Sequence, residues 1–148
     1  MTTYPSVTSL IPHRSPMLLV ERVLDVQEKT GVARAVVGKE HLFLREDGTL
    51  APEVHCELIA QGFGVCEGYR RTQKGLSMNG GGFLSSLREV QLFAPVYAGD
   101  ELTVYTEKTD TCFDTHIVRG EVWRGSEKLA QAVVYVFVWQ GEEPPSSL

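Results

Sequence analysis

The sequence predicts an α+β fold in which an antiparallel sheet wraps around one long central helix. The first observation is residues 52–71 (PEVHCELIAQGFGVCEGYRR), the only long segment whose apolar residues recur at helical spacing. The second is a set of six strand-like segments, two before this helix and four after it, bounded by turn signals. With 148 residues, the chain fits a single domain, 1–148, that is long enough to bury a core.

The predicted helix combines an acid with several glycines. Glu57 lies between a Cys and a Leu, and the next turn offers no Lys or Arg that could neutralise it. Gly62, Gly64 and Gly68 each cost about 1 kcal/mol relative to Ala in a helix interior. Packing must therefore hold this helix together. Glycines allow surrounding backbone to come close, which favours a helix enclosed by a sheet over a helix on the surface.

A hairpin is predicted before the helix. Residues 17–26 are rich in Leu and Val, and the sequence EKTG then makes a turn into residues 31–38, which alternate as a returning strand does. The pattern breaks at residues 39–51, where Asp47 and Gly48 are typical of a turn. We expect this segment to be a loop that leads into the helix.

Four strands are predicted after the helix. A polar, Gly-rich link precedes them, and they cover residues 83–93, 101–110, 115–123 and 129–139. The last of them is nearly continuous in apolar residues, which is typical of an interior strand or of one covered on both faces. Residues 1–9 and 141–148 are expected to be a flexible leader and a flexible tail.

Composition narrows the possible classes of function. The net charge is −5 and no basic stripe is visible, which argues against a nucleic-acid-binding protein. No apolar run approaches the roughly 18 residues of a membrane span, and the N-terminus lacks the pattern of a secretory signal. The three cysteines are odd in number and form no CxxC pair, so we expect reduced, buried thiols, no metal site and a cytoplasmic location.

Four sequence blocks resemble the hotdog-fold 3-hydroxyacyl-(acyl carrier protein) dehydratases across almost the whole chain. The blocks are IPHRSPMLLVERVLDV, ELIAQ, LREVQLFAPVYAGDELTVYTE and LAQAVVYVFV, in this order and spacing. The resemblance implies a hotdog fold and an active site at the interface of two subunits. These form a homodimer or a dimer of dimers, or a heterodimer with a related hotdog subunit. It also implies acyl thioesters carried on phosphopantetheine, either on acyl carrier protein or on coenzyme A, and no other cofactor.

The resemblance also implies site residues. The family uses a Glu in an E-x-x-A-Q setting on the central helix and a His in a Gly-His-Phe-Pro-Gly box before it, contributed by different subunits. Glu57 matches the first, with Gln61 behind it as a substrate-binding candidate. The box is missing, because LFLREDGTLAP stands in its place. Glu57 is therefore the predicted acid and base, and His41 before the loop is a weaker catalytic candidate.

The remaining histidines are interpreted as structural. His55 lies roughly 200° around the helix from Glu57, so the two cannot easily share a pocket within one chain. His13 and Arg14 match the Pro-His-Arg corner of the family, for which we expect a structural role. His116 lies on a late strand and has no visible partner in the sequence.

Basic residues at the helix end suggest a docking surface for an acidic carrier protein. The candidates are Arg70, Arg71, Lys74 and Arg88. A solvated helix terminus favoured by the helix dipole is an equal alternative for these charges. Gly80, Gly81 and Gly82 are candidates for lining the acyl channel, or they only make a sharp turn.

Three functions therefore stay open at the level of the sequence. The first is a 3-hydroxyacyl-thioester dehydratase of fatty-acid or polyketide and polyene-type synthesis. The second is a hotdog acyl thioesterase, in which Glu57 activates water. The third is a non-catalytic subunit that pairs with a catalytic dehydratase.

Overall fold

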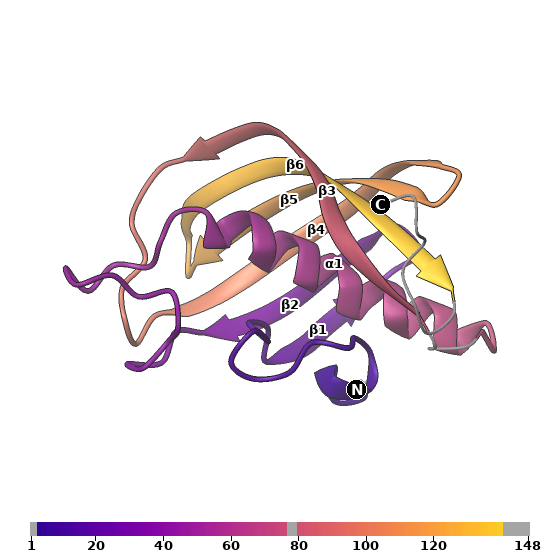
Figure 1. The fold of residues 1–148 in the computed structure, drawn as a ribbon, viewed down its shortest axis with the longest axis horizontal. Helices are drawn as coiled ribbons and strands as arrows, with labels where there is room; N and C mark the ends of the chain where they lie inside the picture. Colours follow the sequence, from indigo (N-terminus) through magenta and orange to yellow (C-terminus); the bar gives the residue numbers. More distant parts are fainter. Residues whose placement is uncertain (1–2, 77–79, 141–148) are drawn as a thin grey trace.

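A computed structural model describes residues 3–76 and 80–140, which form one helix and one antiparallel sheet of six strands. The elements are η1 (Val7–Ser9), β1 (Arg22–Val26), β2 (Thr30–Val36), α1 (Val54–Gln73), β3 (Gly80–Leu92), β4 (Glu101–Cys112), β5 (Thr115–Arg124) and β6 (Glu127–Gln140). The strand order is β1-β2-β4-β5-β6-β3. Figure 1 shows the sheet curling around α1. The predicted fold class is confirmed.

The first strand is shorter than predicted. The sequence analysis placed a strand over residues 17–26, but β1 begins at Arg22. The reason is a side chain of α1: the Gln61 carboxamide accepts a hydrogen bond from Leu19 N at 2.8 Å and donates one to Met17 O at 2.9 Å. Backbone groups that would otherwise pair with a neighbouring strand are therefore bound to the helix.

Two strands use glycine to admit side chains of the helix. A Cβ atom at Gly120 in β5 would lie 2.7 Å from Ile59 Cγ1, and one at Gly31 in β2 would lie 2.8 Å from Cys66 Cβ. Real Cβ atoms do not come so close, so only glycine fits at these positions. Burial at this contact raises the pKa of the Cys66 thiol to about 12. The helix is thus enclosed as the sequence predicts, and glycines in the sheet leave space for its side chains.

The N-terminal segment packs against the body of the protein, in contrast to the expected flexible leader. Tyr4 accepts a hydrogen bond from Val26 N at 3.1 Å, and its ring meets Tyr69 edge to face at 4.9 Å. Val7 and Leu10 are buried in the core. These apolar residues anchor an otherwise polar segment. Residues 1–2 and the predicted flexible tail at 141–148 lie outside the described residues.

The last strand is interior, as predicted. β6 lies between β5 and β3, so both of its edges are paired. Ala132 and Val134 are buried on one face, whereas Gln131 and Tyr135 on the other face are half-buried. β3 lies at the end of the sheet and pairs only with β6.

The cysteines differ in part from the expectation of buried thiols. Cys56 and Cys66 are buried on the helix, but Cys112 is exposed at the end of β4. All three are free. Within the described residues, no helix is both long and apolar enough to cross a membrane.

Candidate active site

A cavity of about 340 Å³ runs along one face of α1. The helix lines it with residues that recur every three or four positions, which are Glu57, Ala60, Gln61, Phe63, Gly64, Glu67, Gly68 and Arg71. This spacing places them on one side of the helix. The other walls are residues 8–14 and the apolar side chains of Leu84, Val136 and Val138 from β3 and β6. The cavity therefore has an apolar wall opposite a partly polar helix face.

Glu57 and His13 face each other in this cavity. His13 Nε2 lies 3.7 Å from Glu57 Oε1, and the two side chains are 28% and 35% exposed. The distance exceeds that of a hydrogen bond, so a small group can be approached by both side chains. His13 was predicted to be structural, and the structure instead places it at the predicted catalytic acid. The only signal in the sequence is that Pro12 and Pro16 fix the corner that carries it.

Gln61 holds Glu57 in place. Its Nε2 donates hydrogen bonds to Glu57 Oε1 at 3.0 Å and to Met17 O at 2.9 Å, and its Oε1 accepts one from Leu19 N. The side chain is 1% exposed. Both amide hydrogens are therefore used within the protein. Gln61 lines the cavity, but it orients Glu57 and offers no free donor to a substrate, in contrast to the predicted substrate-binding role.

The histidines nearest to Glu57 in the sequence lie elsewhere. His41 Nδ1 accepts a hydrogen bond from Phe43 N at 3.2 Å, and His41 is not among the described residues that line the cavity. The structure thus does not bring this weaker catalytic candidate to Glu57. His55 is buried away from the cavity, as its helical position predicts. Burial lowers the pKa of both imidazoles.

Arg70 is unavailable for docking. It is 8% exposed, and its guanidinium donates to Gln27 O and Thr30 O at 2.8 Å each. Arg70 therefore ties the helix to the β1–β2 turn, which corrects the predicted docking role. Its place on the inner side of α1 gives the physical reason, because the carbonyl groups of the turn need donors there.

The other candidates for carrier-protein docking and for the acyl channel are not gathered in one place. Arg71 lines the cavity, Lys74 is exposed just beyond α1, and Arg88 is exposed over the Tyr135 ring at 5.7 Å. Docking by these three residues stays a prediction. Gly82 lines the cavity, and its role in an acyl channel stays a prediction. Gly80 and Gly81 begin β3, but their surroundings lie outside what the structure describes.

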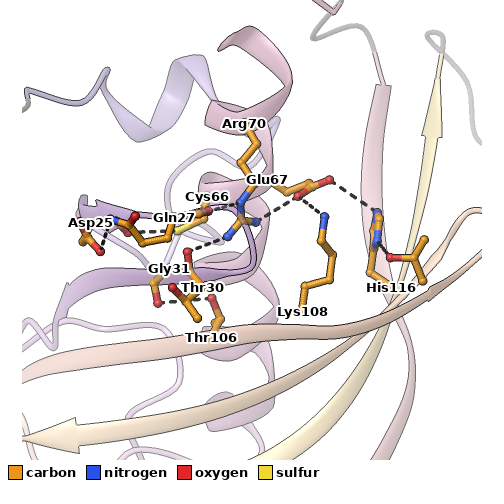
Figure 2. A network of polar contacts seen from close by, with 11 residues as sticks. Asp25, Gln27, Thr30, Gly31, Cys66, Glu67, Arg70, Thr106, Lys108 and His116 are labelled. Atoms are coloured by element: carbon orange, nitrogen blue, oxygen red, sulfur yellow. Dashed lines mark hydrogen bonds and ion pairs between the residues drawn. The ribbon is translucent and has the colours of Figure 1, made fainter. Parts of the chain in front are cut away.

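A second polar centre, the Glu67 cluster of Glu67, Arg70, Lys108 and His116, lies between α1 and the sheet (Figure 2). Glu67 Oε1 is 3.0 Å from Arg70 Nη1 and 3.3 Å from Lys108 Nζ, and Glu67 Oε2 is 3.7 Å from His116 Nε2. His116 Nδ1 also lies 2.9 Å from Thr111 Oγ1. The sequence showed no partner for His116, since β5 and the helix meet only in the fold.

The residues of the Glu67 cluster shift one another's pKa values. Burial alone would raise the pKa of Glu67, but Lys108, Arg70 and His116 together hold this pKa below its usual range. Burial lowers the pKa of His116, and Lys108 and Arg70 add to this effect while Glu67 opposes it. Glu67 is therefore ionised and His116 neutral near pH 7. Among the described residues, no three His, Cys, Asp or Glu side chains converge into a group that could hold a metal ion.

Solved structures with the same fold include a chain of a dehydratase heterocomplex and a probable thioesterase. One chain of the dehydratase heterocomplex ApeI:P from Xenorhabdus doucetiae matches with a TM-score of 0.87 and 22% identity, over 98% of this chain and 95% of that one. PaaI of the phenylacetic acid degradation operon of E. coli matches with a TM-score of 0.60 and 16% identity, over 78% and 81% of the two chains. A probable thioesterase from Bartonella henselae matches with a TM-score of 0.59 and 14% identity, over 80% and 96%. These likenesses confirm the hotdog fold.

The family comparison is more specific than the fold. No curated protein matches the chain. The model of the ApeP-like family, described as ApeP dehydratase, matches residues 5–145 and so includes the His13 corner, the central helix and all six strands. The chain therefore belongs to the ApeP-like dehydratase family of hotdog-fold proteins.

Proposed function

We propose that this protein dehydrates a 3-hydroxyacyl thioester and that Glu57 and His13 are its acid and base. The observation that carries the proposal is the 3.7 Å approach of His13 Nε2 to Glu57 Oε1 within one cavity. Dehydration needs one group that removes the proton from C2 and another that donates a proton to the hydroxyl group leaving C3, and a carboxyl with an imidazole is such a pair. His13 takes the place of the histidine box that the chain lacks.

The reaction is an elimination that the pair can carry out with one shared proton. One member removes the proton from C2 of the acyl group, and the electrons of that C–H bond form the C2=C3 double bond. The C3–O bond breaks as the other member donates its proton to the departing hydroxyl group, which leaves as water. The products are the 2-enoyl thioester and water. The base is then protonated and the acid is deprotonated, and a proton transfer between them restores their starting protonation states.

The cavity walls suit an acyl thioester. Leu84, Val136 and Val138 form an apolar wall for the acyl chain opposite Glu57. The elimination of water involves no net oxidation or reduction, so it requires no redox cofactor. We infer that the acyl group is carried on phosphopantetheine, on acyl carrier protein or coenzyme A, in a fatty-acid or polyketide type of synthesis.

We also propose that the chain pairs with a second hotdog subunit along β3. This strand is at the end of the sheet, and it exposes Leu87, Val90 and Leu92 to solvent, each at least 43% exposed. An unpaired strand edge with apolar side chains is a template for another strand. The similar chain from Xenorhabdus doucetiae belongs to a dehydratase heterocomplex, which supports a related subunit as the partner, and a second copy of this chain is the alternative.

The test is to purify the chain alone and to offer it a 3-hydroxyacyl-CoA and a plain acyl-CoA. We expect enoyl product from the first and no free thiol from the second. Glu57→Gln and His13→Gln should each lower kcat by about 100-fold or more. His41→Gln is the matched control and should keep full activity, because His41 is not among the described cavity-lining residues.

Other outcomes identify the alternatives. Release of free thiol would favour an acyl thioesterase, in which Glu57 activates water. If the chain alone acts on neither substrate, a catalytic pair within one chain is refuted and the role of a non-catalytic subunit is favoured. Full activity of Glu57→Gln would remove the proposed mechanism altogether.

A further inference from the structure

The elimination needs a third group besides the acid and the base. When the proton leaves C2, negative charge develops on the oxygen of the neighbouring thioester carbonyl. A hydrogen-bond donor at that oxygen lowers the barrier, and loss of one such donor costs an enzyme about 100-fold or more in kcat. Glu57 and His13 act at C2 and C3, so a different residue has to supply this donor.

The donors nearest to Glu57 on the helix are already used within the protein. Gln61 donates both of its amide hydrogens, one of them to Glu57 itself. The backbone N–H groups of residues 54–56, at the start of α1, donate to carbonyl oxygens of residues 51–53 at 3.0 to 3.3 Å. The helix therefore has no free donor beside the acid in this part of the structure.

Other polar residues that line the cavity do not supply the donor either. Ser9 Oγ donates its hydrogen to Ser6 O at 2.7 Å. Arg71 lines the cavity at its other end, about 21 Å from Glu57 along the helix axis. This distance is too long for a group that must touch an atom next to C2.

Arg14 is a cationic side chain close to the proposed pair. It lines the same cavity, and its Nη1 donates to Ile11 O at 3.0 Å and to His13 O at 2.7 Å. These two hydrogen bonds fold the guanidinium back over the corner of the chain. They hold it beside His13, whose imidazole lies 3.7 Å from Glu57.

The guanidinium of Arg14 keeps donors in reserve. The two backbone carbonyl groups use the hydrogens of Nη1. Among the described residues, no acceptor binds Nε or Nη2, and no carboxylate forms an ion pair with this side chain. Arg14 is also exposed, so a ligand in the cavity can reach these donors.

The position of Arg14 favours a carbonyl oxygen over a phosphate as its acceptor. The phosphate of phosphopantetheine lies at the far end of the pantetheine arm from the thioester. The carbonyl carbon, in contrast, is bonded directly to C2. Because Arg14 is tied to the backbone of His13, the carbonyl oxygen is the acceptor within its reach.

We propose that Arg14 is a further catalytic residue, which donates a hydrogen bond from Nε or Nη2 to the thioester carbonyl oxygen. The proposal rests on the proposed function, because it places the thioester at Glu57 and His13. As the base takes the C2 proton, the electrons of the C–H bond delocalise onto the carbonyl oxygen. Arg14 stabilises this charge and transfers no proton. The electrons then form the C2=C3 bond as the C3–O bond breaks and the hydroxyl group leaves as water with the proton of the acid.

The test uses an unreactive ligand, a saturated acyl-CoA that carries carbon-13 at its thioester carbonyl. Isotope-edited infrared spectra at saturating protein should show the C=O band of the bound ligand at lower frequency than that of the free ligand, because a hydrogen bond from a cation weakens the C=O bond. Arg14→Gln keeps an N–H donor for the corner and removes the charge, so it should lose most of this shift. Arg22→Gln is the matched control, because Arg22 is exposed and is not among the described cavity-lining residues.

A second pair of variants separates contact with the carbonyl from an effect through His13. The band should still shift in His13→Gln, and the shift should disappear when Arg14→Gln is added. In the otherwise unchanged protein, Arg14→Gln should lower kcat by about 100-fold with little change in KM. Loss of the shift in His13→Gln alone would assign the band to His13 and overturn the proposal.

The remaining outcomes are equally decisive. An unshifted band in the wild-type protein, or a full shift in Arg14→Gln, would overturn the proposal, since the second result assigns the contact to another donor. Arg14→Lys carries the test if Arg14→Gln fails to fold. Its single nitrogen cannot hold the corner and also reach the substrate as the guanidinium does, so a full shift there would refute the contact.

Dehydration of a 3-hydroxyacyl-CoA is measured separately. A shift that depends on Arg14 without any dehydration would refute the proposed function and leave Arg14 as a carbonyl-binding residue. Dehydration together with an unchanged band in Arg14→Gln would refute the role of Arg14 and leave the proposed function intact.

Discussion

The chemistry of the candidate site depends on what each side chain meets across the cavity. Glu57 is positioned by Gln61, which in turn holds the backbone of residues 17–19. That backbone continues from the corner that carries His13. One buried carboxamide thus connects both members of the proposed acid–base pair, and its loss should affect stability and catalysis together.

Replacing Gln61 by Leu tests this connection. The change leaves Leu19 N–H and Met17 C=O buried without their partner, so the free energy of unfolding should fall by roughly 2 to 4 kcal/mol. Denaturation with urea measures the loss. Gln73→Leu makes the same change at an exposed position at the end of α1 and should have little effect. An equal loss in both variants would show that the hydrogen bonds of Gln61 are not the cause.

The buried histidines predict a dependence of stability on pH. Burial lowers the pKa of His55, so the unfolded chain takes up a proton at higher pH than the folded protein does. The stability contributed by neutral His55 is complete above the unfolded pKa near 6.5, and it is lost as pH falls toward the folded pKa. Urea denaturation at pH 7 and pH 5 should therefore give a smaller difference for His55→Leu than for the wild-type protein. An unchanged difference would contradict this origin.

At the scale of elements, the fold depends on close contact between α1 and the strands that surround it. Glycines in β2 and β5 leave space for Cys66 and Ile59 of the helix. Gly62 of the helix lies close to Val104 of β4 in the same way, since a Cβ there would come within 2.9 Å of Val104 Cγ1. The glycines that weaken α1 as an isolated helix are thus part of what allows the sheet to enclose it.

Gly120→Ala tests this packing. The new Cβ would overlap Ile59, so the free energy of unfolding should fall by about 1 to 3 kcal/mol. Gly38→Ala is the control, because no atom lies within 4 Å of a Cβ at that position. The double variant Gly120→Ala with Ile59→Ala should lose less stability than the sum of the single variants. Simple additivity in denaturation experiments would refute a direct clash.

At the scale of the whole molecule, one chain leaves the edge of its sheet open. β3 pairs only with β6, and its exposed apolar side chains include Leu87 and Leu92, which are 46% and 50% exposed. The cavity is also lined by Gly82 and Leu84 of this strand. A partner bound along β3 would therefore lie beside the candidate active site.

The variant Leu87→Lys with Leu92→Lys tests this edge. Lysines on an edge strand oppose pairing with another strand, so a dimer of the wild-type chain should become a monomer in light scattering after gel filtration. Leu42→Lys with Leu76→Lys changes two equally exposed residues outside the strands and should stay dimeric. A double variant of β3 that is still a dimer would exclude this edge as the interface.

The sequence by itself determined the fold class, the order of the elements, the position of Glu57 and the resemblance to the dehydratases. These features depend on local periodicity and on short motifs, which are visible along the chain. Only the tertiary structure decided which side chains meet. It brought His13 to Glu57 from 44 positions away, buried Arg70 under the β1–β2 turn, and placed His116 beside Glu67. Such contacts depend on how the helix is rotated inside the sheet, and no local pattern encodes that rotation.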